Sequence, residues 1–151
     1  MENNVVPIFD IKPTEDLRNK IYQLQSLMIE SKDNQVHIEP THNFANGMYA
    51  RGILIPRDVT IIGKIHKYDH ICIISKGEIS VITDDGMKRI KAPATFVSTA
   101  GAKRAMYAHE DSEFIVIHST KETDVELAEL DLVCETEEQY LEFKTKLLED
   151  K

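Results

Sequence analysis

Eight short segments rich in β-branched residues follow one another between residues 48 and 118, separated by short stretches that contain turn-forming residues. Such close spacing is typical of a two-sheet sandwich or jelly roll and not of an open meander. We therefore expect a mainly β barrel of about eight strands. The predicted strands are Met48–Ile55, Val59–His66, His70–Ser75, Glu78–Thr83, Met87–Lys91, Thr95–Ser98, Arg104–His109 and Glu113–His118.

Turns between these strands are predicted from residues that accept the backbone angles of a tight reversal. Asp84, Asp85 and Gly86 form the clearest hairpin turn, because Asp and Gly tolerate a positive φ. Lys76 with Gly77 and residues 110–112 mark two further turns. Between residues 36 and 46 the pattern is irregular, which predicts a loop with a short edge strand.

The hydrophobic period becomes helical on both sides of the β-rich region. We expect one N-terminal helix within residues 13–31, a barrel over residues 48–118 and two C-terminal helices within residues 123–149, all in one domain. The upstream apolar stripe is Leu17, Ile21, Leu24 and Met28, and the downstream helices are Asp124–Asp131 and Glu137–Leu148, with capping-box spacing at Thr123/Glu126 and Thr136/Gln139.

Charge and composition limit the partners. The net charge of −8 argues against non-specific binding to nucleic acid or to anionic membranes. Residues 51–104 nevertheless carry +5, and the rest of the chain carries −13. This distribution indicates either simple solvation of acidic helices or a basic pocket that accepts a small anionic molecule. The first residues lack a positively charged signal region, and no apolar run approaches a membrane span, so we expect a soluble, cytoplasmic protein.

One stretch between the predicted second and fourth strands concentrates the reactive side chains. In GKIHKYDHICIISKGEI, alternation along a strand places Lys64 and His66 on the same face, and His70 opens the next strand beside them. We therefore expect Lys64, His66 and His70 to meet at one mouth of the barrel. The two cysteines have no paired spacing, and Cys72 lies in an apolar run that predicts an inert core thiol.

This stretch resembles the first motif of the cupin superfamily, in which a Gly precedes His-x-His, a Glu and a second Gly. Here Asp58 stands at the first Gly, Lys64 at the first His, His66 at the second His, His70 at the Glu and Gly77 at the last Gly. The second cupin motif falls on residues 93–108 with one match, and there the position of the metal-binding His is Arg104. The resemblance covers about half of the chain and implies a jelly-roll barrel with an internal pocket.

In cupins with the full motif, three His and one Glu bind a metal ion. Lysine and arginine occupy two of those four positions here, and their charges repel a divalent cation. His66 and His70 remain, which is one ligand fewer than the usual three of a catalytic site. A divalent metal on His66 and His70 is therefore the less favoured interpretation, and the identity of any cofactor stays open.

The favoured interpretation is a basic cavity for a phosphate, a carboxylate or a sugar nucleotide, because arginine forks suit oxyanions and imidazole and phenol groups add hydrogen bonds. Other histidines and arginines are expected at the surface or in structural hydrogen bonds. The predicted ligand-binding residues are Lys64, His66, Tyr68, His70, Arg104 and Tyr107, and the residues assigned no role are His37, His42, His109, His118, Arg51 and Arg57.

Three functional hypotheses remain. The first is a non-catalytic module that binds a small anion. The resemblance implies the second, a cupin enzyme that acts on a sugar or a small carbonyl compound, either with a metal or with a His base and a Tyr acid. The whole chain also resembles small cupin-like proteins encoded by tailed phages, which implies action on host metabolites or signals in the host cytoplasm, or a third role in the virion or its assembly. Apolar helix stripes and open sheet edges favour a homo-oligomer, most simply a dimer.

Overall fold

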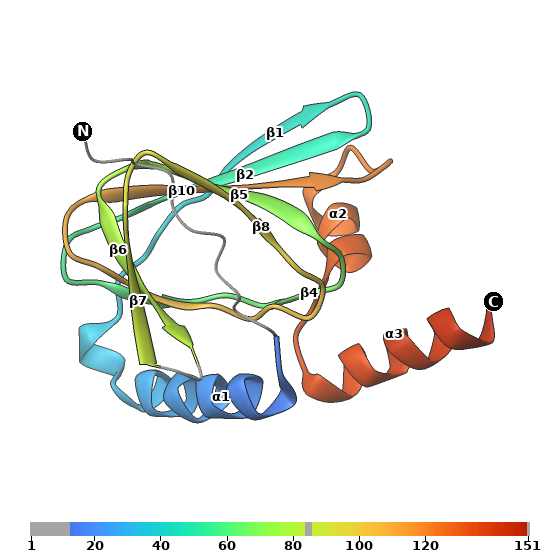
Figure 1. Cartoon of the computed structure of the whole chain (residues 1–151), viewed down its shortest axis with the longest axis horizontal. Coiled ribbons are helices and arrows are strands. Elements are labelled where there is room, and N and C mark those ends of the chain that lie inside the picture. The colour runs from blue at the N-terminus through green and yellow to red at the C-terminus, as the bar shows by residue number, and fades with distance from the viewer. Residues whose placement is uncertain (1–12, 84–85, 151) are drawn as a thin grey trace.

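The computed structural model describes residues 13–83 and 86–150 and forms a barrel of antiparallel sheets flanked by helices (Figure 1). The larger sheet has five strands and the smaller sheet has four, and a separate two-stranded ladder lies beside them. The predicted mainly β fold with one N-terminal and two C-terminal helices is confirmed. In spatial order, the five-stranded sheet is β1 (Thr41–Ala45), β2 (Met48–Ile55), β10 (Ser112–Ser119), β5 (His70–Lys76) and β8 (Ala94–Ser98), and the four-stranded sheet is β3 (Thr60–Ile62), β9 (Ala105–Ala108), β6 (Glu78–Thr83) and β7 (Gly86–Lys91).

The predicted strand Val59–His66 is wrong in one respect. The chain forms β3, leaves the sheet at Gly63 and Lys64, and then forms β4 (Ile65–His66). β4 pairs with β11 (Val133–Cys134), a short strand that the sequence pattern did not predict. This break brings residues far apart in the sequence to the same end of the barrel.

Two of the three predicted turns fall within the described residues. Gly77 has φ +87°, and a Cβ at this position would lie 2.6 Å from the carbonyl oxygen of Asp111, so the turn accepts only glycine without rearrangement. In the third predicted turn, Asp84 and Asp85 lie outside the described residues, and Gly86 has φ +104°. The edge strand expected within residues 36–46 is β1, which pairs with β2.

The helices lie where the periodicity places them. α1 (Glu15–Glu30) follows the N-cap Thr14, and α3 (Glu137–Glu149) begins with the predicted capping box, in which Thr136 and Gln139 each bond to the backbone of the other. α2 (Val125–Leu132) is capped by Asp124 and not by Thr123, because the Asp124 carboxylate accepts the N–H of Leu127. A short 3₁₀ helix, Lys32–Asn34, follows α1. None of the helices in the described part of the chain is long and apolar enough to cross a bilayer.

The barrel core forms between the two sheets, and α1 packs against it along the lower side of the view in Figure 1. Leu17 and Ile21 of α1 pack into the same apolar cluster as the inward residues of both sheets (Figure 1). Cys72 belongs to this cluster, and burial raises the pKa of its thiol to about 12, which keeps the thiol protonated and unreactive. The inward residues are Ile55, Cys72, Ile74, Ile79, Val81, Ile90, Ala94, Phe96, Ala105, Met106, Ala108, Phe114 and Val116.

A buried arginine joins α1 to α3. Arg18 is 4% exposed; its guanidinium donates to both carboxylate oxygens of Glu137 at 2.7 and 2.8 Å and to the carbonyl oxygen of Gly101 at 3.2 Å. The guanidinium also lies 4.9 Å from the ring centroid of Tyr140. These contacts connect both helices to the loop before β9.

We expect the Arg18→Met substitution to lower the free energy of unfolding by about 2–3 kcal/mol, because it leaves the Glu137 carboxylate without its partner in a largely buried site. Urea denaturation measures the change. Arg89→Met is the matched control: Arg89 pairs with Glu78 at the surface, so its loss should lower the free energy of unfolding much less than the loss of Arg18. Equal losses in the two variants would contradict a structural role for the buried pair.

Candidate functional site

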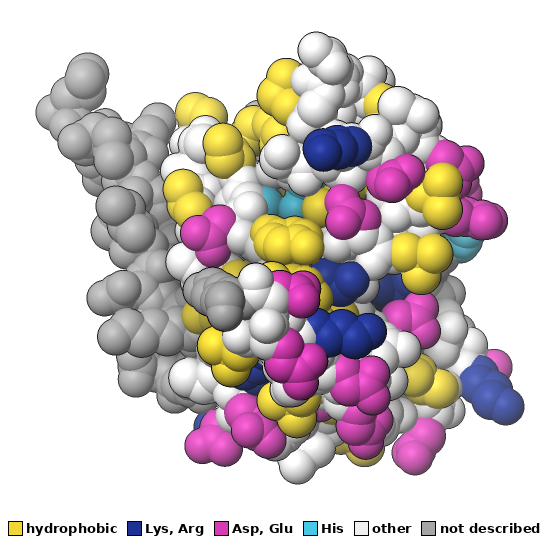
Figure 2. All heavy atoms as spheres, turned by 90° about the vertical axis from the view of Figure 1, so that its right-hand side faces the viewer, with side chains coloured by type: hydrophobic (Ala, Val, Ile, Leu, Met, Phe, Trp, Pro, Cys, Tyr) yellow, Lys and Arg dark blue, Asp and Glu magenta, His cyan; other side chains and the backbone are white. Residues whose placement is uncertain are grey.

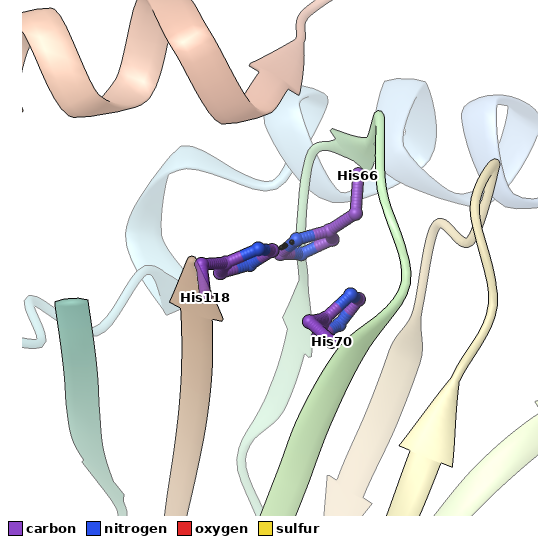
Figure 3. A group of neighbouring side chains, drawn as sticks. All are labelled: His66, His70 and His118. Atoms are coloured by element: carbon purple, nitrogen blue, oxygen red, sulfur yellow. Dashed lines mark hydrogen bonds between the residues drawn. The ribbon is translucent and has the colours of Figure 1, made fainter. Parts of the chain in front are cut away.

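Three histidines from three different strands meet at one end of the barrel (Figure 3). His118 comes from β10, His70 opens the neighbouring strand β5, and His66 ends β4. The ring centroids of His66 and His70 are 4.2 Å apart, those of His70 and His118 are 4.4 Å apart, and those of His66 and His118 are 5.0 Å apart. One ring nitrogen of each histidine lies within 4.8 Å of the others, so the three can coordinate one ion.

Burial keeps the three imidazoles uncharged at neutral pH. It is the largest cause of the lowered pKa of each ring, and it lowers the pKa of His118 to about 4. The neighbouring imidazoles lower the pKa of His66 and His118 further, and Arg104 does the same for His66 and His70. Neutral imidazole is the form that binds metals.

Hydrogen bonds hold the rings in place. Nδ1 of His70 lies 3.0 Å from the carbonyl oxygen of Tyr68, which can only accept, so Nδ1 carries the proton and Nε2 keeps its lone pair. Nδ1 of His66 lies 3.0 Å from Nε2 of His118. Nδ1 of His118 is buried and has no hydrogen-bond partner. Both His70 Nε2 and the His118 ring therefore retain capacity for a further ligand.

The histidines line a cavity of about 270 Å³ inside the barrel. Arg104 also lines it, is 8% exposed and donates through Nη2 to Ser98 Oγ at 2.6 Å, while its Nε has no partner. Arg51 of β2 faces the same cavity. The remaining lining residues are mainly apolar: Ile38, Tyr49, Ile53, Ile61, Ile62, Gly63, Lys64, Cys72, Met106, Phe114, Val116, Glu129, Leu132 and Val133.

Four of the six predicted ligand-binding residues line this cavity, namely Lys64, His66, His70 and Arg104. Lys64 lies at the rim, where its ammonium group pairs with Glu129 at 3.4 Å and Glu135 at 3.2 Å. The structure therefore places Lys64 in an ion-pair network and leaves Arg104 as the more deeply buried cation.

The two predicted tyrosines do not line the cavity. Tyr68 is 40% exposed and packs edge-on against Phe143 of α3. Tyr107 points to the other side of its strand, where its hydroxyl donates to Asp58 at 2.7 Å. Strand alternation explains Tyr107, since its neighbour Met106 is the inward residue.

Two residues that line the cavity were not predicted to do so from the sequence. His118 was expected at the surface or in a structural role, but it is 3% exposed and completes the histidine cluster. Arg51 was expected in solvent, but it lines the cavity. Alternation could have revealed both, because Phe114, Val116 and His118 form one face of β10. In the same way, Tyr49, Arg51 and Ile53 form one face of β2. The predicted deficit of one metal ligand is removed by His118.

The C-terminal segment covers the mouth of the cavity. Glu129 and Leu132 of α2 and Val133 of β11 line it, and the Lys67 ammonium group donates to the carbonyl oxygen of Leu130 at 2.7 Å. Figure 2 shows the face that carries α2 and α3, with histidine atoms visible in a recess between hydrophobic and acidic side chains. The cavity therefore opens at the end of the barrel that α2 and β11 partly cover.

No protein-family profile matches the chain, and no curated protein is significantly similar to it in sequence. Solved structures similar to the barrel include a cupin-2 domain protein from Shewanella frigidimarina NCIMB 400, with 14% identity and a TM-score of 0.46 over 62% of this chain and 92% of that chain. KdgF from a Halomonas species has 19% identity and a TM-score of 0.48 over 58% and 83% of the two chains. An acetylacetone dioxygenase from Acinetobacter johnsonii has 15% identity and a TM-score of 0.48 over 56% and 61%.

Proposed function

We propose that this chain binds a divalent transition metal through His66, His70 and His118 and holds a small anionic molecule beside it with Arg104. The observation that carries the proposal is the cluster of three uncharged imidazoles, with nitrogens within 4.8 Å of one another, at the end of an internal cavity. Three protein ligands with an open position are typical of sites that bind both a metal and a second ligand.

The donor set fits such an ion. Imidazole nitrogen suits zinc, copper, iron and nickel and does not suit magnesium or calcium. The His70 tautomer leaves Nε2 available for a metal, and the carbonyl oxygen of Tyr68 orients the ring as an outer partner would. A metal bound by all three rings would replace the hydrogen bond between His66 Nδ1 and His118 Nε2, because one of those two nitrogens carries the proton of that bond.

Charge supports an anionic second ligand. Three neutral imidazoles do not offset the charge of a divalent ion, and the guanidinium groups of Arg104 and Arg51 add further positive charge to the same cavity. Glu129, at the rim, is already paired with Lys64. A small anion would therefore relieve the repulsion between a metal and the arginines.

The chain's own residues would bind and orient the anion. The buried Arg104 guanidinium has Nε free to donate, and the apolar wall of the cavity limits competing water. A bound metal would supply Lewis acidity toward a carbonyl or carboxylate oxygen. A chain that only binds the anion would be a binding module, and a chain that also converts it would be an enzyme.

Protein purified without chelators, or titrated with Co²⁺ after chelator treatment, is expected to take up about one metal ion per chain. Elemental analysis and the visible absorption of bound Co²⁺ measure the uptake. The His66→Gln variant should fall below about a tenth of an equivalent. The same low value in the unaltered protein would overturn the metal site.

A second candidate is a metal-free anion site, which the unpartnered Nε of Arg104 favours. It predicts thermal stabilisation by phosphate or carboxylate that survives chelator treatment and is lost in Arg104→Gln.

A metal-free acid–base enzyme has less support, because Tyr68 and Tyr107 lie outside the cavity. A homodimer, a phage origin and a virion role stay predictions.

A further inference from the structure

The inward side chains of the five-stranded sheet form layers that change from polar to apolar along the barrel. Tyr49 lies opposite His118, and His70 lies opposite Ser98, so the layer at the mouth is polar. The next layer joins Arg51, Val116, Cys72 and Phe96 across four strands. The third layer, Ile53, Phe114, Ile74 and Ala94, is entirely apolar.

The facing sheet continues the apolar part. In the four-stranded sheet, Met106 pairs with Ile61 on one side and with Val81 on the other. Ile61 and Met106 line the cavity. Among the described residues that line the cavity, Glu129 is the one carboxylate, and it lies at the rim with its side chain 42% exposed. The cavity therefore has one charged end, formed by the histidines and arginines, and an apolar interior without hydrogen-bonding partners for a second polar group.

We infer that the anion bound here is a short aliphatic monocarboxylate, with its carboxylate at Arg104 and the histidine cluster and its chain between Val116, Phe114 and Met106. The inference rests on the proposed anion site and narrows its ligand class. The cavity, at about 270 Å³, lies just below the usual range for drug-sized ligands, which favours a small molecule.

Other anions fit the layers less well. A sugar phosphate would bury hydroxyl groups against Val116, Phe114 and Met106, where they would lose their hydrogen bonds to water. A dicarboxylate would place a second charge in the apolar layer, which is more costly still. An aliphatic chain instead gains free energy from leaving water.

Calorimetric titration of the Co²⁺-loaded protein with acetate, pentanoate and glutarate tests the inference. Each added methylene should tighten binding about fourfold, so pentanoate should bind roughly 60-fold more tightly than acetate. Glutarate, with the same chain length and a second carboxylate, should bind no better than acetate. Equal affinity for acetate and pentanoate, or preferred binding of glutarate, would overturn the inference.

Two matched valine substitutions locate the binding of the chain. Val116→Thr places a hydroxyl against the assigned position of the aliphatic chain at nearly constant volume and should reduce the preference for pentanoate over acetate by roughly three- to tenfold. Val97→Thr makes the same change on the outer face, where Val97 is 57% exposed, and should leave the preference unchanged. Equal effects of the two substitutions would reject the assigned position of the chain.

Co²⁺ uptake, followed separately by its absorption, distinguishes the two proposals. Normal uptake with no chain-length preference overturns the ligand class and leaves the metal site standing. A chain-length preference in protein that takes up no Co²⁺ supports the ligand class and overturns the metal site.

Discussion

Replacing His118 by Asn should weaken metal binding by at least about 100-fold. Loss of a residue that only hydrogen-bonds to a metal ligand already lowers the metal affinity about 10–100-fold in many proteins, and His118 is itself a proposed ligand. Removal of His118 leaves two imidazoles and the same two arginines in the cavity, so the remaining site has fewer ligands and unchanged positive charge. Competition titration with a chromophoric chelator measures the affinity for Co²⁺ or Zn²⁺.

The matched control is His109→Asn. His109 directly follows β9 of the four-stranded sheet, its Nε2 is 2.6 Å from Ser80 Oγ, and it does not line the cavity. Its replacement should leave the metal affinity within about twofold of the unaltered protein, because it removes no ligand. Retained affinity in His118→Asn would instead show that His118 is a structural residue of β10.

Chelator-treated protein is expected to lose stability as the pH falls from about 6.5 to about 4. The pKa of His118 is about 4 in the folded chain and near 6.5 in the unfolded chain, so the unfolded chain binds its proton first. The free energy of unfolding therefore falls through this window and levels off below it. The shifted pKa of His118 alone accounts for a loss of about 3 kcal/mol in the free energy of unfolding. The lowered pKa values of His66 and His70 act in the same direction.

Urea denaturation at about pH 7.5, 5.5 and 4 measures this effect. Surface carboxylates also titrate near the lower end of the range, so the comparison with His118→Asn isolates the histidine contribution. The variant should show a loss between pH 7.5 and 4 that is smaller by about 3 kcal/mol. Parallel curves for the two proteins would mean that His118 titrates alike in the folded and unfolded chains.

The local elements were largely predictable because they depend on neighbouring residues. The stripe from Leu17 to Met28 places α1, and the pair Thr136 and Gln139 fixes the start of α3, since both signals lie within a few residues of each other. The run Met48–Ile55 is a strand with the predicted bounds. The break at Gly63 was missed because pairing of β4 with β11 depends on residues about 70 positions away.

The sequence by itself determined the mainly β fold, the flanking helices and the meeting of His66 with His70, because periodicity and short spacing act locally. The position of Arg104 near them was implied by the resemblance to the cupin motifs. Only the tertiary structure decided that His118 joins them, that Arg51 faces inward and that Tyr68 and Tyr107 face outward. These outcomes depend on strand register and closure of the barrel, which bring together side chains 52 residues apart such as His66 and His118.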